Sequence, residues 1–303
     1  MVQRHSKLPT EQLLPNETRS FLIRPFLIET DPHETHESPH RHNFQEILWV
    51  RSGNGEHAID GQRLPIQAQT FYLIAKGQVH QLITGIDLDG LVIRFTDAFL
   101  PNFLSQEMGH YQTVLFNNVT INHTLPVQPP SLTNFERLLQ QLLAEFNSQK
   151  ANENQEILRH LLTVLLIKLG KVQRELMDDV QTACPEQRLG SQAETAVDQE
   201  TQLFHQFTLL LEQQFSQTHA VQVYAQVLNI TPRHLSVITQ RFVGRTAKHH
   251  IEDRLLLEAK RLLTFTNLSV KEIAHQLGYK DPSHFSKMFK KKTETTPQTY
   301  KSG

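Results

Sequence analysis

The chain has 303 residues, of which 38% are hydrophobic and 20% charged, a composition that supports a packed core and excludes wholesale disorder. At ~150 residues per domain, this length predicts about two domains. Cys184 is the only cysteine, which excludes an intrachain disulfide framework and a metal site built from several cysteines. The N-terminal residues lack an apolar signal core, and no apolar run reaches the ~18 residues of a membrane span, so we expect a reduced, cytoplasmic location with no membrane partner.

Charge is divided unevenly along the chain. The formal net charge is −1, but residues 1–200 carry 16 basic and 24 acidic side chains, whereas residues 201–303 carry 14 and 7. Such asymmetry predicts an acidic and a basic module with different partners. Five lysines fall between positions 287 and 301, behind two phenylalanines at helical spacing, so we expect this helix to face a negatively charged partner.

Residues 21–96 predict short strands. Gly-Asn-Gly at 53–55 and Asp-Gly at 60–61 are hairpin signals, and several apolar runs follow at regular spacing. An antiparallel sandwich or barrel is therefore expected, followed by loops up to residue 130.

Residues 131–177 change to helical periodicity. The run 131–146 places its apolar residues on one stripe, whereas the next helix is apolar over more than one face. Such a helix packs against its own domain and a partner subunit, or is wholly internal to the domain. Residues 178–200 are polar and have no apolar period. We therefore expect a domain at 1–177, a linker at 178–200 and an all-helical domain at 201–303.

Two segments of the basic half, 223–242 and 272–291, resemble each other, and each predicts a short helix, a tight turn and a second helix. A small alanine allows the two helices to cross closely, a capping residue begins the second helix, and a proline fits its first turn. This is the pattern of a helix-turn-helix unit. The matched positions are Ala225 with Ala274, Leu228 with Leu277, Thr231 with Asp281, Pro232 with Pro282, His234 with His284, Leu235 with Phe285, and Ser236 with Ser286.

The second helix of each unit leaves polar side chains free, and such side chains can reach base edges in a major groove while lysines meet phosphates. A lysine-rich helix end that only complements its own dipole is the alternative. Residues 246–265 predict one amphipathic helix between the units. About eighteen of these residues, at ~1.5 Å each, span ~27 Å, near the ~34 Å between successive major-groove faces. One rigid helix can therefore place both units on adjacent grooves.

Residues 205–300 resemble the DNA-binding domain of AraC/XylS-type transcriptional regulators, most specifically in "LSVKEIAHQLGYKDPSHFSKMFKKKTETTPQTYK". The resemblance implies double-stranded promoter DNA as the partner. Two positions depart from the family pattern: Glu294 stands where glycine is usual, and Thr239 replaces an aromatic residue, with Phe242 one turn later. The DNA-contacting residues that the resemblance implies are Arg233, Ser236, Val237, Gln240, Pro282, Ser283, His284, Ser286 and Lys287 for bases, and Arg254 and Lys290 for phosphates.

The acidic half contains His40-x-His42-x-x-x-Glu46, with His80 downstream, and this spacing resembles the first and second motifs of the cupin barrel. Residues two apart on a strand point to the same face, so the two histidines of the first motif could converge inside a barrel. Three interpretations stay open: structural polar groups, effector contacts without a metal, or ligands of a divalent transition metal. Trp49 is a further candidate for the lining of an effector pocket.

Two functions follow from these patterns. The first is an effector-responsive activator of the AraC family, with a cupin-like antiparallel β-barrel, a helical dimerisation segment and two helix-turn-helix units. Its partners would be promoter DNA, a small-molecule effector, a second copy of the chain and RNA polymerase, with no cofactor. The second is a metal-dependent cupin enzyme with a helical appendage, which needs a bound metal with an open position.

Overall fold

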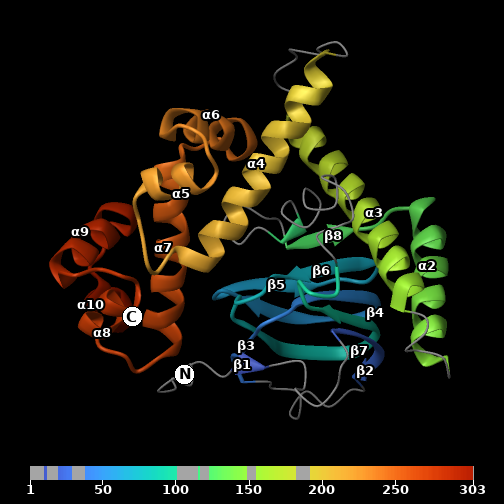
Figure 1. Ribbon diagram of the computed structural model, residues 1–303. Helices are drawn as coiled ribbons and strands as arrows, with labels where there is room; N and C mark the ends of the chain where they lie inside the picture. The colour runs from blue at the N-terminus through green and yellow to red at the C-terminus, as the bar shows by residue number, and fades with distance from the viewer. Residues whose placement is uncertain are drawn as a thin grey trace. The chain divides into compact units, whose positions relative to one another are not determined.

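The computed structural model describes residues 10–11, 20–28, 38–100, 115–116, 123–148, 155–181 and 192–302. These residues form two compact units, one within 10–181 and one within 192–302 (Figure 1). The polar segment expected as the linker, 178–200, contains the end of one helix and the beginning of the next, and its centre, with Cys184, lies outside the described residues. The domain boundaries at 177 and 201 stay a prediction.

The first unit is built on an antiparallel sheet of six strands, as the sequence predicts. The sheet order is β2-β7-β4-β6-β8, with β5 paired to β4. A separate parallel pair joins β1 to β3. The strands are β1 (Thr10–Glu11), β2 (Phe21–Ile28), β3 (Arg41–His42), β4 (Gln45–Ile59), β5 (Gln62–Ile66), β6 (Thr70–Ile74), β7 (His80–Phe95) and β8 (Thr124–Pro126).

One of the two expected hairpins is correct and the other is wrong. Asp60 and Gly61 form the turn between β4 and β5, with φ angles of 51° and 82°. Residues 53–55, in contrast, lie inside β4, where its register against β7 shifts. A Cβ atom on Gly53 would lie 2.4 Å from the carbonyl oxygen of Asp87, so the glycine serves the close approach of the two strands and not a turn.

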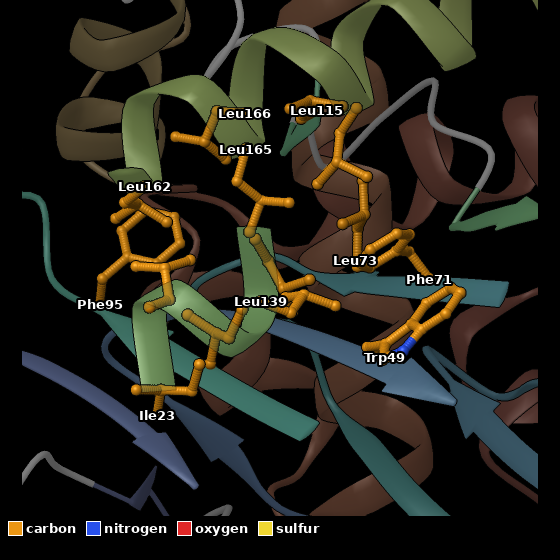
Figure 2. Packing of buried hydrophobic residues seen from close by; sticks show 14 of the residues in the cluster. Ile23, Trp49, Phe71, Leu73, Phe95, Leu115, Leu139, Leu162, Leu165 and Leu166 are labelled. Carbon is orange, nitrogen blue, oxygen red and sulfur yellow. The ribbon is translucent and has the colours of Figure 1, made fainter. Parts of the chain in front are cut away.

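The two faces of the sheet bury different clusters. On the outer face, Trp49, Phe71 and other side chains pack against two helices, α2 (Ser131–Asn147) and α3 (Gln155–Gln181). Figure 2 shows Leu139 of α2 and leucines of α3 directed at these side chains. On the inner face, residues from both halves of β4 share one cluster with residues of neighbouring strands, so the sheet curls around it. The inner cluster consists of Val50, Ile59, Ile66, Tyr72, Ile74 and Leu88.

Helix α3 is apolar on more than the face that packs against the sheet. Leu162, Leu165 and Leu166 are buried, whereas Ile157 and Val164 are 49% and 41% exposed. The exposed residues form the second apolar face that the sequence indicates. Among the described residues, no helix is both long and apolar enough to cross a membrane.

The second unit is entirely helical among its described residues. Its helices are α4 (Gln192–Gln214), α5 (Val221–Val227), α6 (Pro232–Val243), α7 (Ala247–Phe265), α8 (Val270–Gln276), α9 (Pro282–Thr293) and α10 (Pro297–Ser302). The pair α5–α6 packs near one end of α7, and α8–α9 lies near the other (Figure 1). The predicted helix between the two helix-turn-helix units is therefore present as α7.

In both helix-turn-helix units, the second helix begins and ends in the same way. The side chains of Thr231 and Asp281 accept backbone N–H groups of α6 and α9, as expected from the sequence. Gly244 ends α6 in the left-handed conformation at φ 68°. Glu294 ends α9 in that conformation at φ 63°, where a side chain carries steric strain that glycine lacks.

Candidate functional site

Helices α6 and α9 present equivalent stripes of side chains at their surfaces. On α6 the stripe consists of Arg233, Ser236, Val237 and Gln240, and on α9 it consists of Ser283, Ser286, Lys287 and Lys290. Positions i, i+3, i+4 and i+7 share one face of a helix, and the two sets are offset by 50 residues throughout. All eight side chains are exposed except Ser236 and Ser286, which are half-buried. Val237 is 55% exposed, so its apolar side chain is accessible to a partner.

The opposite face of each helix holds it in the unit. Leu235 and Ile238 of α6, and Phe285 and Phe289 of α9, are fully buried in one core. The stripes thus cannot turn inward without unfolding the unit.

The position two residues beyond the end of each stripe differs between the two helices. On α6 it is Phe242, whose ring stacks on Phe204 at 4.9 Å. On α9 it is Lys292, which pairs with Glu252 and Asp253 of α7. Lys292 therefore anchors α9 and is not free for a phosphate. The buried Thr239 donates its hydroxyl to the carbonyl of Ser236, so an aromatic residue is not needed there.

The polar groups on the stripes, and Lys291 beside them, differ in whether they already have a hydrogen-bond partner. Arg233, Lys287, Lys290 and Lys291 are exposed, and none of them pairs with a carboxylate among the described residues. The amide of Gln240 donates to the carbonyl of Gly244 at 2.9 Å.

Two further candidates lie at the beginning of α9. His284 is exposed, 4.0 Å from Asp281, and Pro282 is half-buried. The carbonyl of Pro282 accepts the hydroxyl of Ser286 at 3.0 Å. Ser286 can therefore accept a hydrogen bond from a partner but has already committed its own proton.

Arg254, predicted from the sequence to contact a phosphate, is buried inside the helical unit. Its side chain is 4% exposed, and its guanidinium contacts Glu212 at 2.8 Å and Glu258 at 3.3 Å. The group also lies 4.0 Å from the centre of the Phe215 ring. Arg254 therefore ties α7 to α4 and is too buried to contact a phosphate, so it is left out of the interface proposed below.

The histidines of the first unit converge on the inner face of the sheet. Strand β3 carries His42, an isolated bridge joins the backbones of His40 and His80, and Glu46 lies at the beginning of β4. The rings of His40 and His42 lie 4.3 Å and 5.0 Å from the ring of His80. The four residues of the predicted effector site therefore lie close together, and their role stays a prediction.

Burial controls the charge of these histidines. It lowers the pKa of His42, holds the pKa of His80 well below its usual value, and lowers the pKa of His57 to about 4. The rings are neutral at pH 7 as a result. The carboxylate of Glu46 accepts the Nε–H of Arg94 at 2.6 Å, so the cluster contains a partly buried ion pair beside these neutral rings.

Two members of this cluster, His57 and Arg94, were not predicted from the sequence. Strict alternation along β4 from Glu46 would place His57 on the opposite face. The register shifts between Val50 and Asn54 reverse the alternation, so that His57 turns inward and contacts His80. Arg94 follows from no local motif, because it reaches Glu46 only through the pairing of β7 with β4.

Trp49 is not part of the inner cluster. It lies three residues after Glu46 and one after Leu48, which puts it on the outer face, where it is fully buried. Its indole N–H donates to Glu136 of α2 at 3.0 Å, and its ring packs on Phe71. Trp49 therefore joins the sheet to α2 and does not face the histidines of the inner face.

Comparisons with known proteins agree with this architecture. Residues 24–166 match the family model of the AraC-like ligand binding domain, and residues 224–303 match a helix-turn-helix domain. The HTH-type transcriptional activator RhaS of Salmonella schwarzengrund is 25% identical over 271 residues, 87% of each chain. RhaS of Salmonella typhimurium shows the same values. The chain belongs to the AraC family of transcriptional regulators. It is thus a DNA-binding regulator of transcription, and the alternative of a metal-dependent cupin enzyme is wrong.

Solved structures with similarity to this AraC-family chain were also found. ToxT from Vibrio cholerae O395 is 14% identical, with a TM-score of 0.38, covering 93% of this chain and 97% of that one. The DNA-binding domain of AdpA, in complex with a target DNA, is 21% identical, with a TM-score of 0.31, covering 33% of this chain and 89% of that one. The family assignment rests on the two family models and the RhaS relatives.

Proposed function

We propose that this AraC-family regulator is an effector-responsive activator that reads promoter DNA with the stripes on α6 and α9. The observation that carries the proposal is the equivalence of the two stripes, which occupy the same four positions of both helices, are exposed at three of them and are backed by one core. Helix-turn-helix proteins place such a helix in the major groove, where its side chains reach base edges.

The side chains divide into two chemical groups. Lysine and arginine can donate to guanine, and Val237 offers an apolar contact to a thymine methyl group. Lys290, near the end of the α9 stripe, suits a phosphate, which contributes affinity without reading sequence. The proposed base-contacting residues of the second helix-turn-helix unit lie near the beginning of α9. They are Ser283, His284 and Lys287, with Pro282 and Ser286 beside them.

The regulatory half of the proposal rests on the first unit. The inner face of the sheet, with His40, His42, Glu46 and His80, is proposed as the effector site of the AraC-like ligand binding domain. The exposed apolar residues of α3 support a homodimer formed through that helix. The RhaS relatives are named activators, which supports activation through RNA polymerase. Effector binding would shift the population of dimer arrangements and so change which half-sites are occupied.

The test begins with genome-wide mapping of the DNA bound by the full chain, followed by affinity measurements on one bound duplex between 50 mM and 200 mM salt. Lys290→Ala is expected to reduce the slope of log K against log salt by about 0.9, because one phosphate contact is lost. Lys287→Ala is expected to cost about 1–3 kcal/mol at one base pair and to relax the preference there.

Lys76→Ala is the matched control, because Lys76 is an exposed lysine on the sheet unit, where it forms a surface ion pair with Asp97. It removes the same charge without touching α9. If Lys287→Ala and Lys290→Ala bind DNA with the affinity and salt slope of Lys76→Ala, α9 does not contact the duplex and the proposed interface is refuted.

A further inference from the structure

The histidines and Glu46 on the inner face of the sheet form a polar cluster that has no role in DNA binding. One potential ligand atom each of His42, Glu46 and His80 lies within 4.8 Å of the other two, and all three side chains are buried. Two imidazole nitrogens and a carboxylate oxygen are donors that divalent transition ions accept. A cluster of polar side chains that only hydrogen-bond to one another can have the same spacing. The hydrogen bonds of each histidine ring therefore decide between such a cluster and a metal site.

His42 is held in the tautomer that leaves a nitrogen free. Its Nδ1 donates to the carbonyl oxygen of Phe44 at 2.7 Å, and since a carbonyl can only accept, the ring proton lies on Nδ1. The lone pair is therefore on Nε2, which is buried and has no hydrogen-bond partner in the described structure. The ring of Phe44 stacks on that of His42 at 4.2 Å and fixes its plane. A backbone carbonyl on the second ring nitrogen is the usual way in which a metal-binding histidine is oriented.

The second ring nitrogen of His80 contacts another histidine. Its Nδ1 lies 3.1 Å from Nε2 of His57, and its own Nε2 is buried without a partner. When Nδ1 of His80 donates to His57, the lone pair of His80 lies on Nε2, as it does in His42. His57 then serves as the orienting residue for His80 and is not itself a ligand.

Glu46 completes the set with a negative charge. Its Oε2 accepts the Nε–H of Arg94 at 2.6 Å, which leaves Oε1 as the oxygen for an ion. Arg94 lies over the ring of Phe44, 5.2 Å from its centre. A hydrogen-bonded carboxylate beside oriented imidazoles is the outer-shell arrangement of protein metal sites.

We propose that His42 Nε2, His80 Nε2 and Glu46 Oε1 bind one divalent transition metal ion inside the AraC-like ligand binding domain. The proposal accounts for both unpartnered Nε2 atoms, which are unfavourable when buried without a hydrogen bond. Three protein ligands leave a coordination position open, which an oxygen or nitrogen donor of a small effector could fill.

The experiment uses the full chain without an affinity tag, stripped of metal by a chelator and titrated with Co²⁺, whose visible absorption reports ligand geometry. We expect one Co²⁺ per chain, displaced by Zn²⁺. His42→Ala and Glu46→Gln should each weaken Co²⁺ binding at least ~100-fold, because each removes a ligand. His57→Leu should weaken it by about 10–100-fold, because it loosens the orientation of His80 without removing a ligand.

The matched control is His160→Ala, which removes an exposed histidine of α3 whose Nδ1 contacts only the carbonyl of Glu156. It should leave Co²⁺ affinity unchanged. X-ray absorption of the wild-type protein loaded with Co²⁺ does not depend on the folding of any variant and should show two imidazoles bound to the ion. Substoichiometric binding, or a His42→Ala protein that binds Co²⁺ as tightly as His160→Ala, would overturn the metal site. The DNA affinity of α6 and α9 is measured separately, so that result would leave the proposed DNA interface standing.

Discussion

Replacement of Arg254 by methionine tests whether this residue stabilises the helical unit or contacts DNA. Methionine keeps much of the apolar volume over Phe215 and removes the charge. Breaking a buried ion pair costs about 3–5 kcal/mol when one partner stays buried and charged. The contact with Glu212 contributes little of this, because Glu212 is 40% exposed. Glu258 retains Arg261 at 3.3 Å, so we expect the lower end of the range, about 3 kcal/mol.

The assay is urea unfolding of the full chain, followed with two probes. Trp49 is the only tryptophan, so its fluorescence reports the sheet unit, whereas circular dichroism at 222 nm also reports the helical unit. Arg254→Met should shift only the helical transition. Arg233→Met, the control on the exposed stripe of α6, should leave both transitions unchanged and weaken DNA binding. A shift below about 1 kcal/mol for Arg254→Met, together with weaker DNA binding by the folded protein, would refute the structural role.

Two further predictions concern the helical unit. Glu294→Gly should raise its unfolding free energy by about 1 kcal/mol, because glycine relieves the left-handed strain at the end of α9. Gly244→Ala, at the equivalent end of α6, should lower the unfolding free energy by a similar amount. A change of the same sign in both variants would contradict the strain argument. For His250, burial lowers the folded pKa to about 4, below the ~6.5 of the unfolded chain. As pH falls, the unfolded state therefore binds the proton first. The contribution of neutral His250 to the free energy of unfolding is complete above pH ~6.5, and about 3 kcal/mol of it is lost as the pH falls to ~4. Urea titrations across this range should show the loss in the wild type and a flatter profile in His250→Leu, and parallel profiles would remove His250 as its source.

The helix-turn-helix units could be predicted from the sequence because their signals are local. The caps Thr231 and Asp281, the prolines after them and the buried alanines are all read within twenty residues of chain, and the structure confirms them. Arg254 was misplaced for a physical reason. A charged residue on an amphipathic helix is normally exposed, and only the docking of α4 supplies Glu212 and Phe215 to bury it.

The inner face of the sheet was only partly predictable. The spacing of His40, His42 and Glu46 indicated a common face, but His57 required knowledge of the bulges in β4. Trp49 was assigned to the pocket because aromatic residues line pockets and cores alike. Its position relative to Glu46 places it on the other face, and only the packing of α2 and α3 shows that this face is a core.

The central claim is that α6 and α9 occupy two neighbouring major grooves of one duplex, held apart by the 19 residues of α7, or ~28 Å. Guanine N7 methylation protection on a mapped site measures this directly. The account predicts two protected patches ~10 base pairs apart on one side of the duplex, of which Arg233→Ala removes one and Lys287→Ala the other. A single patch, or the loss of the same patch in both variants, would contradict it.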